Sequence, residues 1–349
     1  MPPLEPPQRR SDEAGADHPT TTRPPHPTAV EPPDAGEVVV AFDLGRPSGT
    51  MTLAARGELG RIWQLETTAG RWAVKELFRG GEEAAARADV AFQEAALSAG
   101  VRMPRPVVAP DGRVLHEVGA GDRRVDVRVY TWVDLAGREH RAPAIDAAGI
   151  LGRIHAIGYR DDGPADPWFL EMPSADRWAG LLHAATGAGV AWLGTLESLV
   201  PSLLEGGPLV ALGRHEPTIR CHRDFNPENV LLDGAGVAVV VDWENSGPAA
   251  AEQELASALA EFVPDPAGTT TFLRAYRDAG GTATLRDRSS FAMTLAVQAN
   301  LVAWYAARAL DPAAAAEDRA RSEHWIRDIA ANVFTIDRID GWLRAASAT

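Results

Sequence analysis

Lysine is almost absent from this chain of 349 residues. Of the 34 basic residues, 33 are arginine and only Lys75 is lysine. Arginine therefore serves at every surface position where either cation would do. The one lysine is then expected where a compact ammonium on a flexible stem is needed and a planar guanidinium would not fit. Chance retention is the alternative, but the count favours a functional role for Lys75.

Cysteines, long apolar runs and secretion signals are also scarce or absent. The single cysteine, Cys221, excludes an intramolecular disulfide framework and suits a reducing cytoplasm. No segment reaches the roughly 18 consecutive apolar residues of a membrane span. The N-terminus lacks the basic start and apolar core of a signal peptide. We therefore expect a cytoplasmic protein without a membrane partner.

Basic clusters are missing as well, and the net charge is −14. Nucleic-acid binding needs Lys and Arg against the phosphates, so we expect no nucleic-acid partner. An acidic surface suits a cationic small molecule, although acidity also simply aids solubility. No motif encodes an oligomeric state, and a monomer is the expectation.

The sequence divides into three parts. Residues 1–36 carry ten prolines among Ser, Thr, Asp, Arg and Glu, a composition that predicts a disordered tail. The next part favours strands plus one helix, because residues 60–77 read as two strands around a Thr-Ala-Gly turn and residues 81–100 as an alanine-rich helix. The remainder is helical. We predict an α+β fold with a small β-rich N-lobe, residues 37–133, and a larger helical C-lobe, residues 134–349.

A hairpin interrupts the helical half. In NVLLDGAGVAVVVDW, two apolar strands flank an Asp-Gly-Ala-Gly turn. Pairing Leu232 with Val237 across a four-residue loop places Asn229 opposite Val240, with Asp242 about two residues beyond at the same open end. An amide oxygen and a carboxylate at this spacing can bridge one Mg²⁺, which takes one or two protein oxygens and leaves its other positions to water and phosphates.

Asp224 lies five residues before Asn229, in the loop that leads into the first strand. A carboxylate held there can accept a proton from a substrate hydroxyl. Phosphoryl transfer needs this division of labour, with metal ligands for the nucleotide and a base for the nucleophile. Any one of these residues also occurs in a polar-ended hairpin without function. The whole pattern, His-x-Asp-x-x-x-x-Asn, an apolar hairpin and then Asp, favours function.

The motif HRDFNPEN and the DWE that follows the hairpin resemble the catalytic loop and metal motif of the aminoglycoside phosphotransferase family. LGRIHA and FLRAYRDAGG resemble that family too. Its members are small-molecule kinases with a two-lobed, protein-kinase-like fold. The resemblance therefore implies this fold for the chain, with ATP as co-substrate and Mg²⁺ as the metal.

The resemblance also assigns roles to the matching residues. Asp224 would be the catalytic base or hydroxyl-orienting carboxylate, and Asn229 and Asp242 the Mg²⁺ ligands. His222 would buttress the catalytic loop. Lys75 matches the strand lysine that pairs the α- and β-phosphates of the nucleotide, in agreement with the argument from lysine scarcity.

In the family that lysine has a glutamate partner on a helix. We expect the partner to be Glu94, which lies mid-helix with Phe92 and Leu97 nearby. Glu82 and Glu83 compete for the role, and an exposed helix glutamate is the alternative for Glu94.

Two further nucleotide-binding segments follow from the resemblance. Gly57 and Gly60 precede a strand where the family has a short phosphate loop, although an ordinary turn would use the same two glycines. The hinge that holds adenine through backbone groups is expected in the segment YTWV, at Thr131 and Val133. Trp132 in that segment serves the hinge or the core.

The chain departs from the family in three places. Asn226 stands where the family often has histidine, beside the expected γ-phosphate. Arg223, next to the base, is expected to contact Asp224 or phosphate, or to form an ion pair inside the loop. Glu254 replaces the aspartate that anchors the catalytic loop from a helix. His155, on an apolar helix face, is predicted to be a satisfied core residue rather than a ligand.

Together these patterns predict an ATP- and Mg²⁺-dependent kinase that moves the γ-phosphate to a hydroxyl of a small molecule, such as an aminoglycoside or another amino alcohol. One rival is a nucleotide-binding regulatory pseudokinase, which the complete residue set argues against. The other is a protein kinase. Against it, the DWE motif leads directly into a turn and a helix, without room for a long activation segment.

Overall fold

A computed structural model describes most of the chain. Residues 1–30, which make up most of the predicted disordered tail, lie outside the described residues. The structure covers residues 31–78, 80–161, 163–214 and 217–347.

The chain divides into two compact units. The first contains the described residues up to Val90 together with Pro104–Val133, and the second contains those of Ala91–Met103 and Asp134–Thr349. One boundary falls between Val133 and Asp134, where the strand-rich pattern ends in the sequence. The segment Ala91–Met103 was assigned to the N-lobe from sequence but packs with the helical unit, because Phe92, Ala96 and Val101 enter its apolar core.

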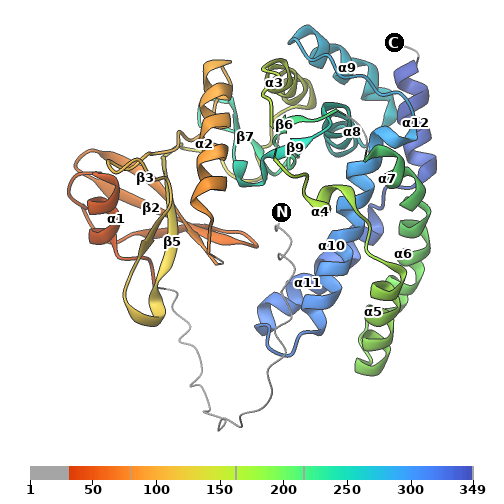
Figure 1. Ribbon diagram of the computed structural model, residues 1–349, viewed down its shortest axis with the longest axis horizontal. Helices are drawn as coiled ribbons and strands as arrows, with labels where there is room; N and C mark the ends of the chain where they lie inside the picture. Colours follow the sequence, from red (N-terminus) through yellow and green to blue (C-terminus); the bar gives the residue numbers. More distant parts are fainter. Residues whose placement is uncertain (1–30, 79, 162, 215–216, 348–349) are drawn as a thin grey trace. The chain divides into compact units, whose positions relative to one another are not determined.

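An antiparallel sheet is the centre of the first unit (Figure 1). The predicted pair of strands around Thr-Ala-Gly is confirmed: Gly60 pairs with Leu77 at one end and Thr67 with Gly70 at the other. Among the described residues the strand order is β1-β2-β3-β5-β4. The strands are β1 Thr52–Arg56, β2 Gly60–Thr67, β3 Gly70–Leu77, β4 His116–Val118 and β5 Val125–Thr131.

Two helices, α1 Ala35–Phe42 and α2 Glu83–Ser98, lie on opposite faces of this sheet. Successive side chains of a strand point to opposite faces, so Val127 and Val129 of β5 face one way and Arg128 the other. The two valines share an apolar core with α1. Arg128 instead meets Asp89 of α2.

Helix α1 is a second helix in the part of the chain where strands and one helix were expected. Its sequence, AGEVVVAF, is rich in β-branched valine, which disposes a segment toward strands. The side chain of Asp34 accepts a hydrogen bond from the amide of Glu37 and caps the helix. Val38, Val39 and Phe42 then lie on its buried side. Local capping and tertiary burial therefore override the strand propensity.

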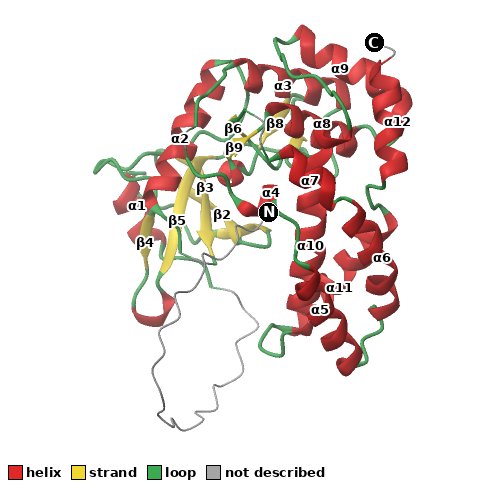
Figure 2. Cartoon of the chain, turned by 45° about the vertical axis from the view of Figure 1, so that its right-hand side comes forward, coloured by secondary structure: helices red, strands yellow, loops and turns green. Residues whose placement is uncertain are grey.

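Helices dominate the second unit (Figure 2). One apolar core joins α3, α8, α9 and α12, and another joins α5, α6 and α11. Helix α10 contributes to both, with Leu295 in the first core and Val302 in the second. The helices are α3 Ala144–Ala156, α4 Pro167–Leu170, α5 Ala175–Ala188, α6 Leu193–Glu205, α7 Gly207–Gly213, α8 Ala251–Phe262, α9 Thr269–Asp278, α10 Ala292–Leu310, α11 Ala316–Ala331 and α12 Ile336–Ser347.

Short strands and single turns complete the second unit. Strand β6 pairs with β9, and β7 pairs with β8, both antiparallel. The motif residues 222–229 and 242–244 lie between these strands, so the two pairs position the candidate site. The strands are β6 Ile219–Cys221, β7 Val230–Leu232, β8 Ala238–Val240 and β9 Gly247–Ala249, and the 3₁₀ turns of the chain are η1 Gly121–Arg123, η2 Trp243–Asn245, η3 Pro266–Gly268 and η4 Arg288–Phe291.

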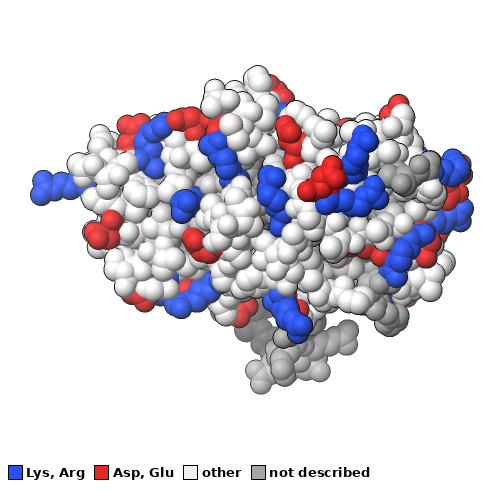
Figure 3. All heavy atoms as spheres, turned by 90° about the horizontal axis from the view of Figure 1, so that it is seen from above, with Lys and Arg blue, Asp and Glu red and all other residues white. Residues whose placement is uncertain are grey.

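The predicted fold class is confirmed, with a strand-rich unit followed by a mostly helical one. Along the described stretches, no helix has both the length and the apolar character that a membrane crossing requires. On the face drawn in Figure 3, basic and acidic side chains lie interspersed among uncharged ones.

Candidate active site

The hairpin β7–β8 carries the predicted metal ligands, and its register differs from the prediction. Leu232 pairs with Ala238 rather than with Val237. The reason is the turn, because the backbone amide of Asp233 donates to the carbonyl of Val237, while the Asp233 carboxylate accepts from the amide of Val237 at 2.8 Å. Five residues, 233–237, thus separate Leu232 from its strand partner, one more than expected, and Asp233 and Val237 bond to each other within this turn. Gly236 completes it with φ +76, a conformation that favours glycine.

The shift brings the two predicted metal ligands one residue closer along the hairpin. The carbonyl of Asn229 accepts from the amide of Val241 at 2.9 Å, so Asn229 lies opposite Val241. Asp242 follows directly. It has φ +63, in the left-handed region that residues other than glycine rarely adopt. Such strain persists only where the surroundings fix it, and it is frequent at functional sites.

Asp224, the predicted base, is buried in the loop between β6 and β7. Its carboxylate is held at both oxygens: Oδ1 accepts from the side-chain amide of Asn226 at 2.8 Å, and Oδ2 from that of Asn245 at 3.3 Å. The side-chain amide of Asn229 donates to the Asp224 carbonyl at 2.9 Å. These bonds fix the orientation of the carboxylate and link it to the predicted metal ligands.

Two of these contacts bear on the sequence predictions. Asn226, which stands where the family often has histidine, holds one oxygen of the predicted base. Asn245 was missed, although it follows the DWE motif immediately and its position was the available signal.

His222 links the catalytic loop, residues 222–229, to the hairpin. The amide of Asp224 donates to its Nδ1 at 3.3 Å, so Nε2 carries the proton and donates to the carbonyl of Val241 at 3.1 Å. The ring also packs edge-on against Trp243, with centroids 4.8 Å apart. His222 therefore connects Asp224 to Val241 and Trp243, the two residues that flank Asp242.

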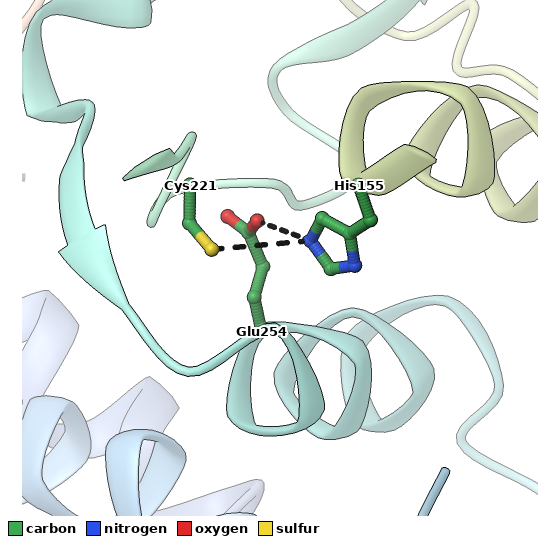
Figure 4. A group of neighbouring side chains, drawn as sticks. All are labelled: His155, Cys221 and Glu254. Atoms are coloured by element: carbon green, nitrogen blue, oxygen red, sulfur yellow. Dashed lines mark hydrogen bonds and ion pairs between the residues drawn. The ribbon is translucent and has the colours of Figure 1, made fainter. Parts of the chain in front are cut away.

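Glu254 of α8 anchors the same loop, and Figure 4 shows its contact with His155. It is 1% exposed, and it accepts hydrogen bonds from the backbone amides of His222 and Arg223 and from His155 Nε2 at 2.8 Å. Burial alone would raise the pKa of Glu254, but the hydrogen bond and charge of His155 and the loop amide hold it below its usual value. The longer side chain thus still reaches the loop.

His155, Glu254 and Cys221 form a buried group with ligand atoms within 4.8 Å of one another. His155 Nδ1 lies 2.8 Å from the Tyr276 hydroxyl, which also accepts from the amide of Ala283. His155 thus bonds Glu254 through Nε2 and Tyr276 through Nδ1. Burial raises the pKa of Cys221 well above its usual value, so the thiol keeps its proton. We interpret the group as a hydrogen-bond network that supports the loop, with His155 a satisfied core residue.

Glu261 is a further acidic residue near the base that sequence reasoning missed. It lies near the end of α8, and its side chain keeps access to solvent. The pKa of Glu261 is raised to about 7, mainly by desolvation and to a smaller extent by the negative charges of Asp224 and Glu228. The opposing positive charges come from Arg338 and Arg141.

Lys75 lies on β3 of the first unit, half-buried, opposite Ile62 of β2 and Arg128 of β5. Cross-strand neighbours share a face of the sheet, so Lys75 and Arg128 point to the same side. Arg128 Nη1 lies 3.1 Å from the carboxylate of Asp89, and these two side chains are only 4% and 7% exposed. A buried carboxylate therefore sits beside the cations of this face.

Glu94, the expected partner of Lys75, is exposed on helix α2. The buried positions of α2 include Ala86, Asp89, Gln93 and Ala96, whose spacing defines the inward side of a helix. The burial of Asp89 was not foreseen, because the apolar residues around Glu94 suggested a different inward side. The repeat from Ala86 to Ala96 was the signal that could have found it.

The remaining nucleotide-binding predictions fall on a turn and a strand end of the first unit. The amide of Gly57 donates to the carbonyl of Gly60 across the β1–β2 turn. A Cβ at Gly60 would lie 2.2 Å from the carbonyl oxygen of Glu76, so strand packing alone requires glycine there. The amide of Thr131 already bonds the carbonyl of Arg105, and Val133 closes the unit.

A strand-rich unit is followed by a helical unit that carries this loop and hairpin with Asp224 and Asp242. Together these features define a small-molecule kinase of protein-kinase-like fold. Residues 50–292 match the sequence profile of the phosphotransferase enzyme family. The chain belongs to this family, as the motifs predicted. No curated protein matches the chain significantly in sequence.

Solved structures share the fold. Spectinomycin phosphotransferase APH(9)-Ia, in complex with ADP and spectinomycin, superposes with a TM-score of 0.58 at 12% identity, covering 89% of this chain and 97% of that one. A microcompartment-associated aminopropanol kinase gives 0.55 at 18% identity, covering 85% and 94%. Amicoumacin kinase hAmiN, in complex with AMP-PNP, Ca²⁺ and its ligand, gives 0.53 at 14%, covering 86% and 94%. At these identities the likeness establishes the fold.

Proposed function

We propose that the protein is an ATP- and Mg²⁺-dependent kinase that transfers the γ-phosphate to a hydroxyl of an amino alcohol. The observation that carries this proposal is the Asp224 carboxylate, held at both oxygens by the amides of Asn226 and Asn245. Family membership supports phosphotransfer as the reaction. The residues that follow from the motifs supply each part that such a reaction needs.

Asp224 serves as the base that orients the acceptor. Its pinned carboxylate receives the hydrogen bond of the acceptor hydroxyl and directs the oxygen in line with the γ-phosphorus. A new bond forms between that oxygen and the γ-phosphorus as the bond from phosphorus to the bridging oxygen breaks. The hydroxyl proton passes to Asp224, and ADP leaves with the electron pair.

Asn229 and Asp242 fit a hard cation. The Asn229 nitrogen is used by the Asp224 carbonyl, which leaves its amide oxygen as the donor for a metal. One amide oxygen and one carboxylate are the ligands that Mg²⁺ takes when nucleotide phosphates supply the rest. When bound, the ion would neutralise charge on the phosphates. His222 and the strained backbone at Asp242 keep these two donors in place.

Lys75 binds the nucleotide phosphates, and we propose Asp89 as the carboxylate that positions it. Asp89 is buried and bonded to Arg128, the cross-strand neighbour of Lys75. Arg128 would share the Asp89 carboxylate with Lys75. Glu94, exposed on the helix, is the competing candidate.

An amino alcohol is proposed as acceptor on two grounds. Solved structures of the same fold include enzymes described as spectinomycin phosphotransferase and aminopropanol kinase. In this chain, the negative charges of Asp224 and Glu228 act on Glu261, so three carboxyl groups lie near one another, which favours a protonated amine on the acceptor.

The test is coupled ADP release with Mg-ATP across a panel of aminoglycosides, macrolides and small amino alcohols. Turnover on an amine-bearing class that disappears in Asp224→Ala supports the proposal. Failure of Mg-ATP to bind would refute the roles of Lys75, Asn229 and Asp242. Binding of Mg-ATP without turnover on any alcohol would favour a regulatory pseudokinase.

A further inference from the structure

Arg223 has an unusual conformation beside the base. Its φ is +62, in the left-handed region, although it is not glycine. Its side chain is nevertheless 9% exposed, so a charged group is almost fully removed from water. Burial lowers the pKa of Arg223, and the carboxylate of Asp166 opposes this effect. Backbone strain and a buried charge both cost free energy, so the surroundings must compensate for them.

The guanidinium is bound by the segment that follows the predicted metal ligand Asp242. Arg223 Nε donates to the carbonyl of Asn245 at 2.6 Å, and Nη2 to the carbonyl of Ser246 at 3.5 Å. Its plane lies over the ring of Phe169, with Cζ 4.1 Å from the centroid. Asp166 is 4.0 Å from Nη2. The planar fork thus bridges consecutive carbonyls, which a lysine ammonium cannot do in the same geometry.

Gly247 leaves the space that this guanidinium occupies. A Cβ built on Gly247 would lie 2.6 Å from Cζ and Nη2 of Arg223. Gly247 is also the strand partner of Cys221 in the β6–β9 pair, so its backbone is fixed close to the catalytic loop. The absence of a side chain at 247 therefore fits Arg223 specifically.

Arg220 binds the same segment independently. Its Nε donates to the Ser246 hydroxyl at 3.2 Å, its Nη2 to the Ser246 carbonyl at 3.3 Å, and its Nη1 to the carboxylate of Asp161 at 2.6 Å. Arg220 and Arg223 thus bind the same carbonyl. Asp161 and Asp166 supply the negative charge that two neighbouring cations require.

This segment acts directly on the base. The side chain of Asn245 donates to Oδ2 of Asp224, while the Asn245 carbonyl accepts from Arg223. We propose that Arg223 is a positioning residue for phosphoryl transfer, because it fixes the segment 242–247 against the catalytic loop and thereby sets the base relative to the metal ligand. The inference rests on the proposed function, and it names a residue that acts through Asn245 rather than on substrate.

The first experiment compares wild type, Arg223→Lys and Arg223→Gln. Binding of Mn²⁺ with AMP-PNP is measured by electron paramagnetic resonance, and kcat and KM are measured with the acceptor found above. Partners that orient ligands typically contribute about 10- to 100-fold in metal affinity or activity. We expect both variants to lose kcat, or metal affinity, by about that factor per folded molecule. The KM for the acceptor should stay within about threefold, because Arg223 does not touch it.

Arg288→Lys is the matched control. Arg288 also makes two hydrogen bonds to one partner, the carboxylate of Asp340, at 2.7 and 2.6 Å, but on the exposed surface. It should match wild type in metal affinity and kcat. A fall equal to that of Arg223→Lys would overturn the specific role of Arg223.

Gly247→Ala separates positioning from packing. Alone it should destabilise the fold, because the new methyl group meets the guanidinium. Combined with Arg223→Ala, which removes the collision, it should regain melting temperature relative to Gly247→Ala without regaining kcat. Recovery of kcat along with stability would overturn the proposal and leave Arg223 a packing residue.

The outcomes distinguish this proposal from the proposed function. If wild type binds Mn²⁺–AMP-PNP and turns over, but Arg223→Lys equals it in both, only the positioning role fails. If wild type binds no metal–nucleotide complex, the kinase function fails and the positioning role with it.

Discussion

Asp89 and Arg128 form a buried ion pair, 3.1 Å apart, between helix α2 and strand β5. Arg128 faces Lys75 across the strands. The carboxylate therefore binds Arg128 on the sheet face that also carries Lys75. A carboxylate in this place can hold both cations in fixed positions, and its loss removes one partner of a buried ion pair.

Replacing Asp89 with Asn should impair nucleotide use. We expect kcat/KM for ATP to fall about 100-fold, the scale on which misplacing a positioning group acts. The free energy of unfolding should also drop by about 3–5 kcal/mol, since one partner of a buried pair is removed. Steady-state kinetics, normalised to the folded fraction, measures the fall in kcat/KM. Unfolding followed by circular dichroism measures the drop in the free energy of unfolding.

Glu94→Gln is the control on the same helix. Glu94 is exposed, so its replacement should change the equilibrium constant of unfolding and kcat/KM by no more than about twofold. A large loss in Glu94→Gln together with a normal Asp89→Asn enzyme would restore Glu94 as the partner of Lys75.

Sequence alone could predict the strand-rich and helical parts of the fold and the family, because both depend on local patterns and motifs. The two strands around Thr-Ala-Gly and the helical second half follow from periodicity and turn residues. The burial of Asp89 rather than Glu94 did not, because the inward side of an alanine-rich helix is set by what packs on it. Here Asp89 is buried against Arg128, a residue distant in sequence.

Glu261 should make stability depend on pH near neutrality. Its pKa rises from 4.5 to about 7 on folding, so the folded state binds this proton more tightly than the unfolded state. Linkage then requires that its contribution to stability falls as pH rises from about 4.5 to about 7. Glu261→Gln cannot lose that proton, so it should be more stable than wild type at pH 8 and equal to it near pH 4.5.

Urea unfolding at pH 4.5, 6 and 8 measures this difference. Glu197→Gln, at an exposed position of α6, should follow the wild-type profile throughout. A constant offset between Glu261→Gln and wild type at all three pH values would mean that Glu261 is not the titrating group.

Gly60 and Gly180 should respond oppositely to alanine. At Gly60 the new methyl would meet the Glu76 carbonyl, which should cost about 1–3 kcal/mol of unfolding free energy. Gly180 lies inside α5 with no atom within 4 Å of a Cβ, so alanine should stabilise by about 0.5–1 kcal/mol. Urea unfolding of both variants checks the signs. An unchanged Gly60→Ala stability with weakened ATP binding would instead favour the phosphate-loop role.

The hairpin shows a second limit of sequence reasoning. The positions of Asn229 and Asp242 at one open end followed from the apolar pattern. The register was wrong by one residue, because the Asp233 side chain closes the turn by bonding to Val237. A side-chain cap of this kind competes with the backbone turn, and turn residues alone do not reveal which one prevails.

The burial of Cys221 has a practical consequence. The only thiol of the chain lies with zero exposure beneath the catalytic loop, and burial raises its pKa, so it is protected from alkylating agents while the loop is folded. Its rate of alkylation therefore reports how often the catalytic core opens. Nucleotide and acceptor should each slow that labelling if they bind and tighten this part of the fold, which makes the native cysteine an internal chemical sensor that needs no engineered probe.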